Sequence, residues 1–204
     1  MGQNSNNPMI PGEFHAFPSD FKMLHGDIKA TEGQYAINHK CILPEGGSID
    51  SVKFPENPEI CARLRGEITF PSCWDGKNSD SADHKSHMTY PENGWAAGKC
   101  PDSHPVRVPT LFFEAEFMTF GIAEPGDSLV YSYNDWEGYG FHGDFLNGWK
   151  DGAIDQLLYF CTFNEDLNVS NCGLDKSSPY ECDWEGNLDD NQFKGPFDEL
   201  PPWN

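Results

Sequence analysis

Hydrophobic and polar residues alternate along four short stretches of the chain, which is the pattern of strands with one buried face. In one stretch, Leu64, Ile68 and Phe70 fall on one face, and Arg65 and Glu67 fall on the other. The predicted strands cover residues 35–41, 64–70, 110–118 and 129–133. The inward faces predicted for the first and third strands are Tyr35, Ile37, His39 and Cys41, and Phe113, Ala115 and Phe117.

One segment has helical spacing instead. Ile154, Leu157, Leu158 and Cys161 recur every three or four residues, and Asp151 can cap the first turn, which predicts a helix over 151–161. Short strands between long loops predict a mainly β fold, a β-sandwich or jelly roll with long disulfide-tied loops and one short helix. We expect one domain over 1–163 and an acidic, loop-rich tail over 164–204 that packs on it.

The charge of the chain is strongly acidic. Its 204 residues include 33 Asp and Glu against 13 Lys and Arg, a formal net charge of −20. Such a field repels phosphate backbones, which argues against nucleic acid as a partner and favours a neutral or cationic one. Because the chain has no run of eighteen apolar residues, we also expect no membrane span.

The seven cysteines are widely spaced and never form Cys-x-x-Cys, so zinc pairs are not indicated. We expect disulfides formed in an oxidising, extracellular compartment, with one cysteine left over. Asn168 begins a glycosylation acceptor triplet. The polar start of the chain has no signal peptide, so a secreted protein has been processed or the sequence begins inside a longer one.

Candidate chemistry gathers in two loop-like regions, 73–105 and 134–149, beside predicted strands. The candidate catalytic residues there are His84, His87, His104 and His142, with Asp83 and Asp144. Three interpretations stay open: an Asp–His pair that transfers protons on a glycan, a divalent metal held by His84, His87 and His142, and side chains that only satisfy loop backbone.

Aromatic and polar residues in the same regions could contact a sugar. The candidate substrate-binding residues are Trp74, Asp75, Lys77, Tyr139 and Trp149. Aromatic faces stack on sugar rings, although such aromatics are more often part of a core or its rim.

Longer motifs in these segments resemble those of a known family. They are residues 21–27 (FKMLHGD), 70–78 (FPSCWDGKN), 83–87 (DHKSH), 100–101 (CP), 104–106 (HPV) and 138–149 (GYGFHGDFLNGW). In this order they resemble a secreted, mostly fungal family, domain of unknown function nineteen-ninety-six, over residues of about 17–161. The resemblance implies an extracellular protein near cell-wall glycans and assigns no reaction. It also implies an earlier segment with a His-x-His pair, which we expect as a missing N-terminal part or a separate chain.

We therefore expect a secreted protein that hydrolyses extracellular polysaccharide by Asp–His acid/base chemistry in a His/Asp-lined cleft. His142 or His84 would be the acid/base, and Asp144 or Asp83 its partner carboxylate. One alternative is a non-catalytic glycan-binding surface protein. The other is a metal-dependent hydrolase, including one that cleaves phosphoesters, whose divalent cation offsets the acidic field.

Overall fold

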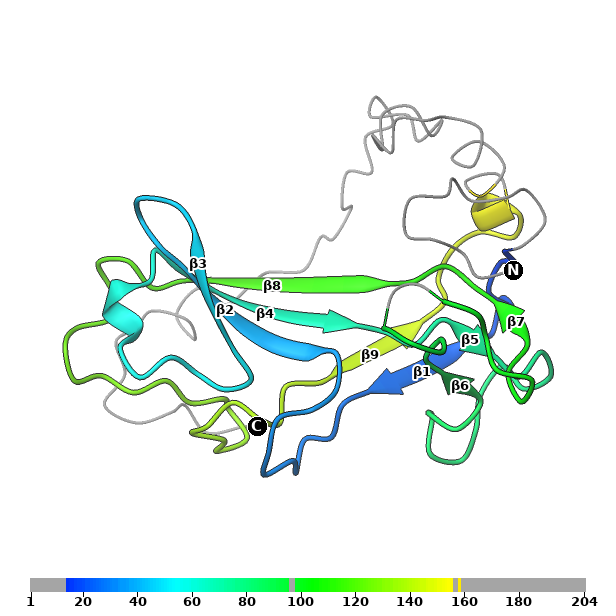
Figure 1. Cartoon of the computed structure of the whole chain (residues 1–204), viewed down its shortest axis with the longest axis horizontal. Coiled ribbons are helices and arrows are strands. Elements are labelled where there is room, and N and C mark those ends of the chain that lie inside the picture. The colour runs from blue at the N-terminus through cyan, green and yellow to red at the C-terminus, as the bar shows by residue number, and fades with distance from the viewer. Residues whose placement is uncertain (1–13, 96–97, 156–157, 159–204) are drawn as a thin grey trace, which may run out of the picture. The chain divides into compact units, whose positions relative to one another are not determined.

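The computed structural model describes residues 14–95, 98–155 and 158, and within them it shows three antiparallel sheets (Figure 1). The largest has the order β3–β2–β4–β8, formed by Ser48–Ser51, Ile37–Ile42, Arg63–Thr69 and Phe112–Met118. The second pairs β1 (Lys22–His25) with β9 (Gly143–Leu146), and the third has the order β6–β5–β7, formed by Met88–Thr89, Cys73–Trp74 and Val106–Arg107. A 3-10 turn, η1, covers Pro58–Ile60. The mainly β class predicted from the sequence is confirmed.

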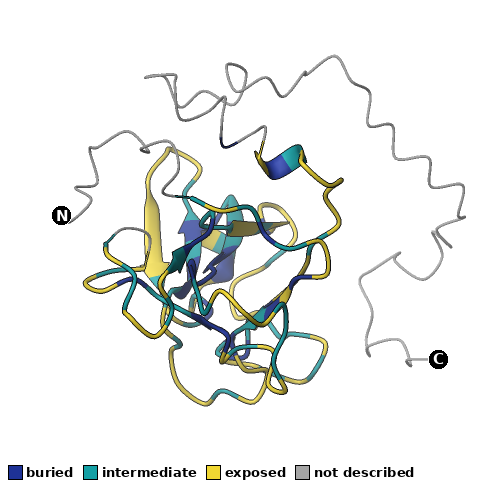
Figure 2. Ribbon diagram, turned by 90° about the vertical axis from the view of Figure 1, so that its right-hand side faces the viewer, coloured by how far each residue is buried: buried dark blue, intermediate teal, exposed yellow. Residues whose placement is uncertain are grey.

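The core lies where the β1–β9 pair packs against β2 and β4. Met23 of β1 and Phe145 of β9 cluster with Ile37 of β2 and Ile68 of β4, and all four are buried. Figure 2 shows this buried material at the centre of the strands, with exposed loops around it. A Cβ on Gly143 would lie 2.8 Å from the Phe70 ring, so the glycine allows β9 to approach this core closely.

Period-two patterning locates β2, β4 and β8 of the large sheet to within a few residues, whereas β3 was not predicted as a strand. Ile37, His39 and Cys41 are buried on one face of β2, as the sequence predicted, whereas Tyr35 lies before the strand and is exposed. Leu64 and Ile68 are likewise buried on β4. The predicted strand 110–118 is β8, at the edge of the sheet, but Phe113 and Phe117 of its predicted inward face are exposed.

The predicted strand over 129–133 is wrong. In its place, Tyr131 forms an isolated bridge with Asp135, and the amide of Asn134 donates to the carbonyl of Tyr131 at 2.8 Å. Asn134 has a φ of +67°, a conformation that asparagine tolerates and that closes a tight turn here. The short alternation therefore belongs to a turn rather than to a strand.

Two disulfides tie the long loops, Cys41–Cys61 and Cys73–Cys100, as expected for the cysteines in this part of the chain.

The predicted helix is present at 153–155 and at Leu158, and it begins after Asp151 rather than being capped by it. Ile154 and Leu158 are buried, in line with their predicted face. No helix among the described residues is long and apolar enough to cross a membrane. The predicted tail, 164–204, and Asn168 lie outside the described residues.

Candidate functional site

β1 lies between the two regions in which the sequence gathers candidate chemistry. On one side, the amides of Lys22 and Leu24 donate to the carbonyls of Ser79 and His84 at 2.9 and 2.8 Å. On the other side, Leu24 pairs with Asp144 of β9. Segment 79–87, β1 and residues 142–146 therefore form one continuous surface, which we call the β1/β9 surface. The sequence did not predict this surface, because no strand was predicted at 22–25.

His142 is held on this surface in one tautomer. Its Nδ1 lies 2.8 Å from the carbonyl oxygen of Gly140, and because a carbonyl can only accept, Nδ1 carries the hydrogen. In the neutral ring, Nε2 is therefore the basic nitrogen. The ring is half-buried, and its centroid lies 5.9 Å from that of Tyr133.

Gly26 and Asp144 complete the surroundings of His142. A Cβ on Gly26 would lie 2.8 Å from the Cβ of His142, and Gly26 has a φ of +93°, so both space and conformation require glycine there. Asp144 lies two residues after His142 and is exposed, whereas Gly143 and Phe145 point to the core. Asp144 therefore lies on the outer face of β9, and His142 directly precedes this strand.

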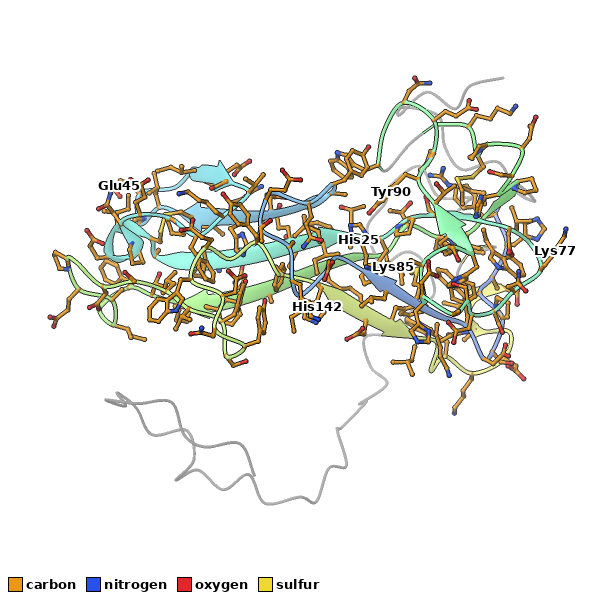
Figure 3. The ribbon with its side chains drawn as sticks, turned by 90° about the horizontal axis from the view of Figure 1, so that it is seen from below. His25, Glu45, Lys77, Lys85, Tyr90 and His142 are labelled. Atoms are coloured by element: carbon orange, nitrogen blue, oxygen red, sulfur yellow. A yellow bond between two sulfur atoms is a disulfide. The ribbon has the colours of Figure 1, made fainter. Side chains whose placement is uncertain are left out.

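Lys85 brings a cation to the same surface. Its Nζ donates to the carbonyl of Gly26 at 2.5 Å, so the side chain spans from segment 79–87 to the end of β1. Figure 3 shows Lys85 and His142 in the middle of the molecule, with Lys77 far from both at one end. Lys85 was not among the site residues predicted from the sequence, although it lies inside the DHKSH motif.

Asp83 and His84 hold the turn that carries Lys85. The Asp83 Oδ1 accepts hydrogen bonds from the amides of Lys85 and Ser86 and from the hydroxyls of Ser81 and Ser86. The Ser86 and Lys85 amides are the main reason that the pKa of Asp83 lies well below its ordinary value. His84 is exposed, and its Nδ1 bonds the Oδ1 of Asp80 at 2.6 Å, which lowers the pKa of that carboxyl.

His87 and His104 are placed differently from the other predicted histidines. His87 is 1% exposed, with Nε2 2.7 Å from the carbonyl of Lys22 and Nδ1 2.8 Å from the Ser81 hydroxyl. Both of its nitrogens are thus engaged: Nε2 joins segment 79–87 to β1, and Nδ1 bonds within that segment. His104 lies further along, with its Nε2 3.1 Å from the carbonyl of Ser86.

A second histidine group, absent from the sequence prediction, lies on the inner side of β1. The Nε2 of His25 is 2.8 Å from the carbonyl of Tyr35 and 2.9 Å from the hydroxyl of Tyr90, which itself donates to the carbonyl of Thr69. Burial lowers the pKa of His25 and raises that of Tyr90. The FKMLHGD motif contains His25 and was the only signal for it in the sequence.

The predicted substrate contacts are divided between two places. Trp74 donates from Nε1 to the carbonyl of Asn78 at 2.7 Å and packs edge-on against Phe21. Asp75 accepts from the amides of Lys77 and Asn78 and so closes the same turn.

Tyr139 and Trp149 flank the β1/β9 surface in sequence. The carbonyl of Tyr139 accepts from Gln34 at 2.6 Å, which holds the segment that leads to His142. Trp149 is 47% exposed.

The predicted metal ligands do not form a metal site in the part of the chain that the structure describes. No group of three or more His, Cys, Asp or Glu side chains there is placed to hold a metal ion. His87 has both ring nitrogens in hydrogen bonds within the protein, so it is not available beside His84 and His142.

A comparison with protein families finds a match to the model "Domain of unknown function (DUF1996)" over residues 3–149. The chain belongs to the DUF1996 family. The matched region contains all of β1 and β9 and segment 79–87, so the whole β1/β9 surface is part of the DUF1996 domain. Searches of curated proteins and of solved structures found no match.

Proposed function

We propose that this DUF1996 chain is a secreted protein that hydrolyses a neutral extracellular polysaccharide, with His142 as the proton-transfer group. The observation that carries the proposal is the fixed tautomer of His142, whose Nδ1–H is anchored on Gly140 while Nε2 has no bonding partner among the described residues. Disulfides Cys41–Cys61 and Cys73–Cys100 support an oxidising compartment, because such bonds persist outside the cytosol.

In the proposed reaction, Nε2 of His142 takes a proton from water as the oxygen of that water attacks the anomeric carbon. The glycosidic C–O bond breaks, the departing oxygen takes a proton from solvent on the opposite face of the sugar, and the imidazolium then releases its proton to solvent. The Asp144 carboxylate, on the outer face of β9, stabilises the imidazolium between the two transfers. Gly140 holds the ring orientation throughout.

A neutral glycan fits the charge of the chain better than a polyanion. The formal net charge of −20 repels uronate or sulfate chains at long range. Lys85, held at Gly26, is a single local positive charge and does not change the sign of this field. Tyr133 beside His142 offers an aromatic edge to a sugar, and burial raises the pKa of Tyr133 to about 12, so the ring stays neutral.

The test is a screen of neutral polysaccharides for new reducing ends, followed by His142→Gln on the substrate that is cleaved. We expect a loss of roughly 100-fold or more in kcat, and a smaller loss for Asp144→Asn. His15→Gln is the matched control, because His15 is exposed and its amide bonds the carbonyl of Arg107, which is outside this surface. Full activity of a folded His142→Gln protein would refute the assignment.

One observation favours non-catalytic glycan binding as a second candidate. Tyr35, Trp95, Trp136 and Trp149 are large aromatics between 47% and 58% exposed, and exposed aromatics are typical of sugar-stacking surfaces. Retention on an insoluble polysaccharide without new reducing ends would favour this candidate over hydrolysis. Loss of retention in Trp136→Ala or Trp149→Ala would then locate the binding surface.

A further inference from the structure

β8 leaves an apolar edge uncovered in the large sheet. Among the described strands it pairs only with β4, although it is seven residues long. Figure 1 shows it along the border of that sheet. Its apolar side chains are exposed by 39% to 63%: Phe112, Phe113, Phe117 and Met118. A long, flat apolar edge of this kind pairs readily with another strand.

The sequence of β8 is close to a palindrome. It reads FFEAEFM, so Ala115 is the centre, with a glutamate and then a phenylalanine on each side. In an antiparallel pair centred on Ala115, Phe113 lies opposite Phe117 of the other strand, and Phe112 lies opposite Met118. We propose that the chain forms a two-fold symmetric dimer through β8, with two copies of the large sheet joined edge to edge. A two-fold axis requires such a self-complementary patch.

The charges on β8 are compatible with this pairing. The register places Glu114 opposite Glu116 of the second copy, which alone would be unfavourable. Within each copy, however, Arg65 Nη1 lies 2.8 Å from Glu114 and Arg63 Nη1 lies 3.0 Å from Glu116. Each glutamate is therefore paired with an arginine of β4 in its own copy, and this ion pair offsets the repulsion between the two glutamates.

The area and shape beside β8 also suit a second copy. Phe120 and Ile122 extend the apolar surface beyond the strand, exposed by 64% and 72%. A fully exposed aromatic side chain has an area of about 150–250 Å². On this scale the four exposed apolar side chains of β8, together with Phe120 and Ile122, expose on the order of 600 Å². Each partner in a standard interface buries roughly 800 Å².

A pocket lies at the Phe117 end of β8. It has a volume of about 320 Å³ and is lined by apolar side chains that include Leu64, Phe117 and Ile122. Leu64 pairs with Phe117 across the sheet, so the pocket lies on the face to which both point. In the proposed register, Phe113 of the second copy is opposite Phe117 on that face, where it supplies an apolar group beside the pocket.

The first test is sedimentation equilibrium of the full chain over a range of concentrations. We expect a dimer whose dissociation constant rises roughly 30-fold or more in Phe117→Lys and in Met118→Lys. The matched control is Ile49→Lys, because Ile49 is 50% exposed on β3, at the opposite edge of the same sheet. An unchanged dimer in both β8 variants would overturn the proposal.

The second test fixes the register. Two copies of Ala115→Cys would meet at the two-fold axis, where Cα atoms of paired strands lie within disulfide range. We expect this variant to crosslink through the introduced thiols on mild oxidation, as mapped by mass spectrometry, and Phe113→Cys not to do so. The dimer is overturned if the chain is a monomer at all concentrations and its β8 amides are protected from hydrogen exchange. That result would indicate that another part of the same chain covers β8.

Discussion

The buried imidazole of His39 makes stability depend on pH in a way that can be calculated. His39 is 1% exposed, and its ring packs edge-on against Phe54 with centroids 5.1 Å apart. Its Nε2 lies 2.9 Å from the Tyr131 hydroxyl, and its Nδ1 has no hydrogen-bond partner within the described residues. Burial lowers the pKa of His39 from 6.5 to about 4, and the opposing effect of Asp135 is smaller.

The sign of the effect follows from which state binds the proton more tightly. Above pH 6.5 His39 is neutral in both the folded and unfolded states. As the pH falls below 6.5, the unfolded chain takes up the proton first, so the free energy of unfolding decreases until about pH 4, where the folded ring also titrates. With 1.36 kcal/mol per pKa unit, the loss is about 2 kcal/mol by pH 5 and about 3 kcal/mol at most.

Urea unfolding of the wild type and of His39→Gln between pH 7 and 5 checks this reasoning. Whatever the stability of the variant at pH 7, its free energy of unfolding should fall by about 2 kcal/mol less than that of the wild type over this interval. His25, whose pKa burial also lowers, contributes equally to both proteins and cancels in the difference. The reasoning is refuted if the two curves are parallel, or if NMR shows the ring of His39 titrating at pH 6 or above.

Two further predictions concern packing and covalent ties. In Gly66→Ala, the new Cβ would lie 2.5 Å from the Phe141 ring, so we expect overpacking to cost about 1–3 kcal/mol, measured as a fall in Tm. An unchanged Tm would mean that Phe141 moves aside freely. Replacing Cys41 and Cys61 together by Ser opens a loop with a sequence separation of 20, which should cost about 3 kcal/mol in urea unfolding. A loss well below 1 kcal/mol would contradict the loop-entropy argument.

Local patterning was sufficient for β2, β4 and β8 of the large sheet, and insufficient for β3 and for the β1–β9 pair. β2 and β4 each contain several buried side chains at a period of two, so their burial appears in the sequence. β1 and β9 have four residues each, and their pairing joins parts of the chain that are distant in sequence. A four-residue alternation cannot be distinguished from a loop unless its partner is known.

The candidate site shows the same limit at the level of single residues. The sequence selected His142 and Asp144, and the structure places Asp144 on the outer face of β9 and His142 directly before this strand. The sequence also included His87 among the candidates, because the spacing of histidines carries no information about burial or about acceptors such as the carbonyl of Lys22. Lys85 and His25 were missed because their roles depend on contacts with Gly26 and Tyr90, which are made only in the folded chain.

The pairing of β1 with β9 also has a consequence for biosynthesis. Residues 22–25 leave the ribosome early, but their partners at 143–146 emerge only when most of the DUF1996 domain has been made. Before β9 is synthesised, segment 79–87 can already bond one edge of β1, whereas the other edge has no partner until β9 is present. Closing so long a loop makes this pairing a late and slow step of folding, so the His142 surface is assembled only on a nearly complete domain. Truncated or stalled chains that lack β9 would therefore expose an unpaired edge of β1 and would not contain the His142 surface.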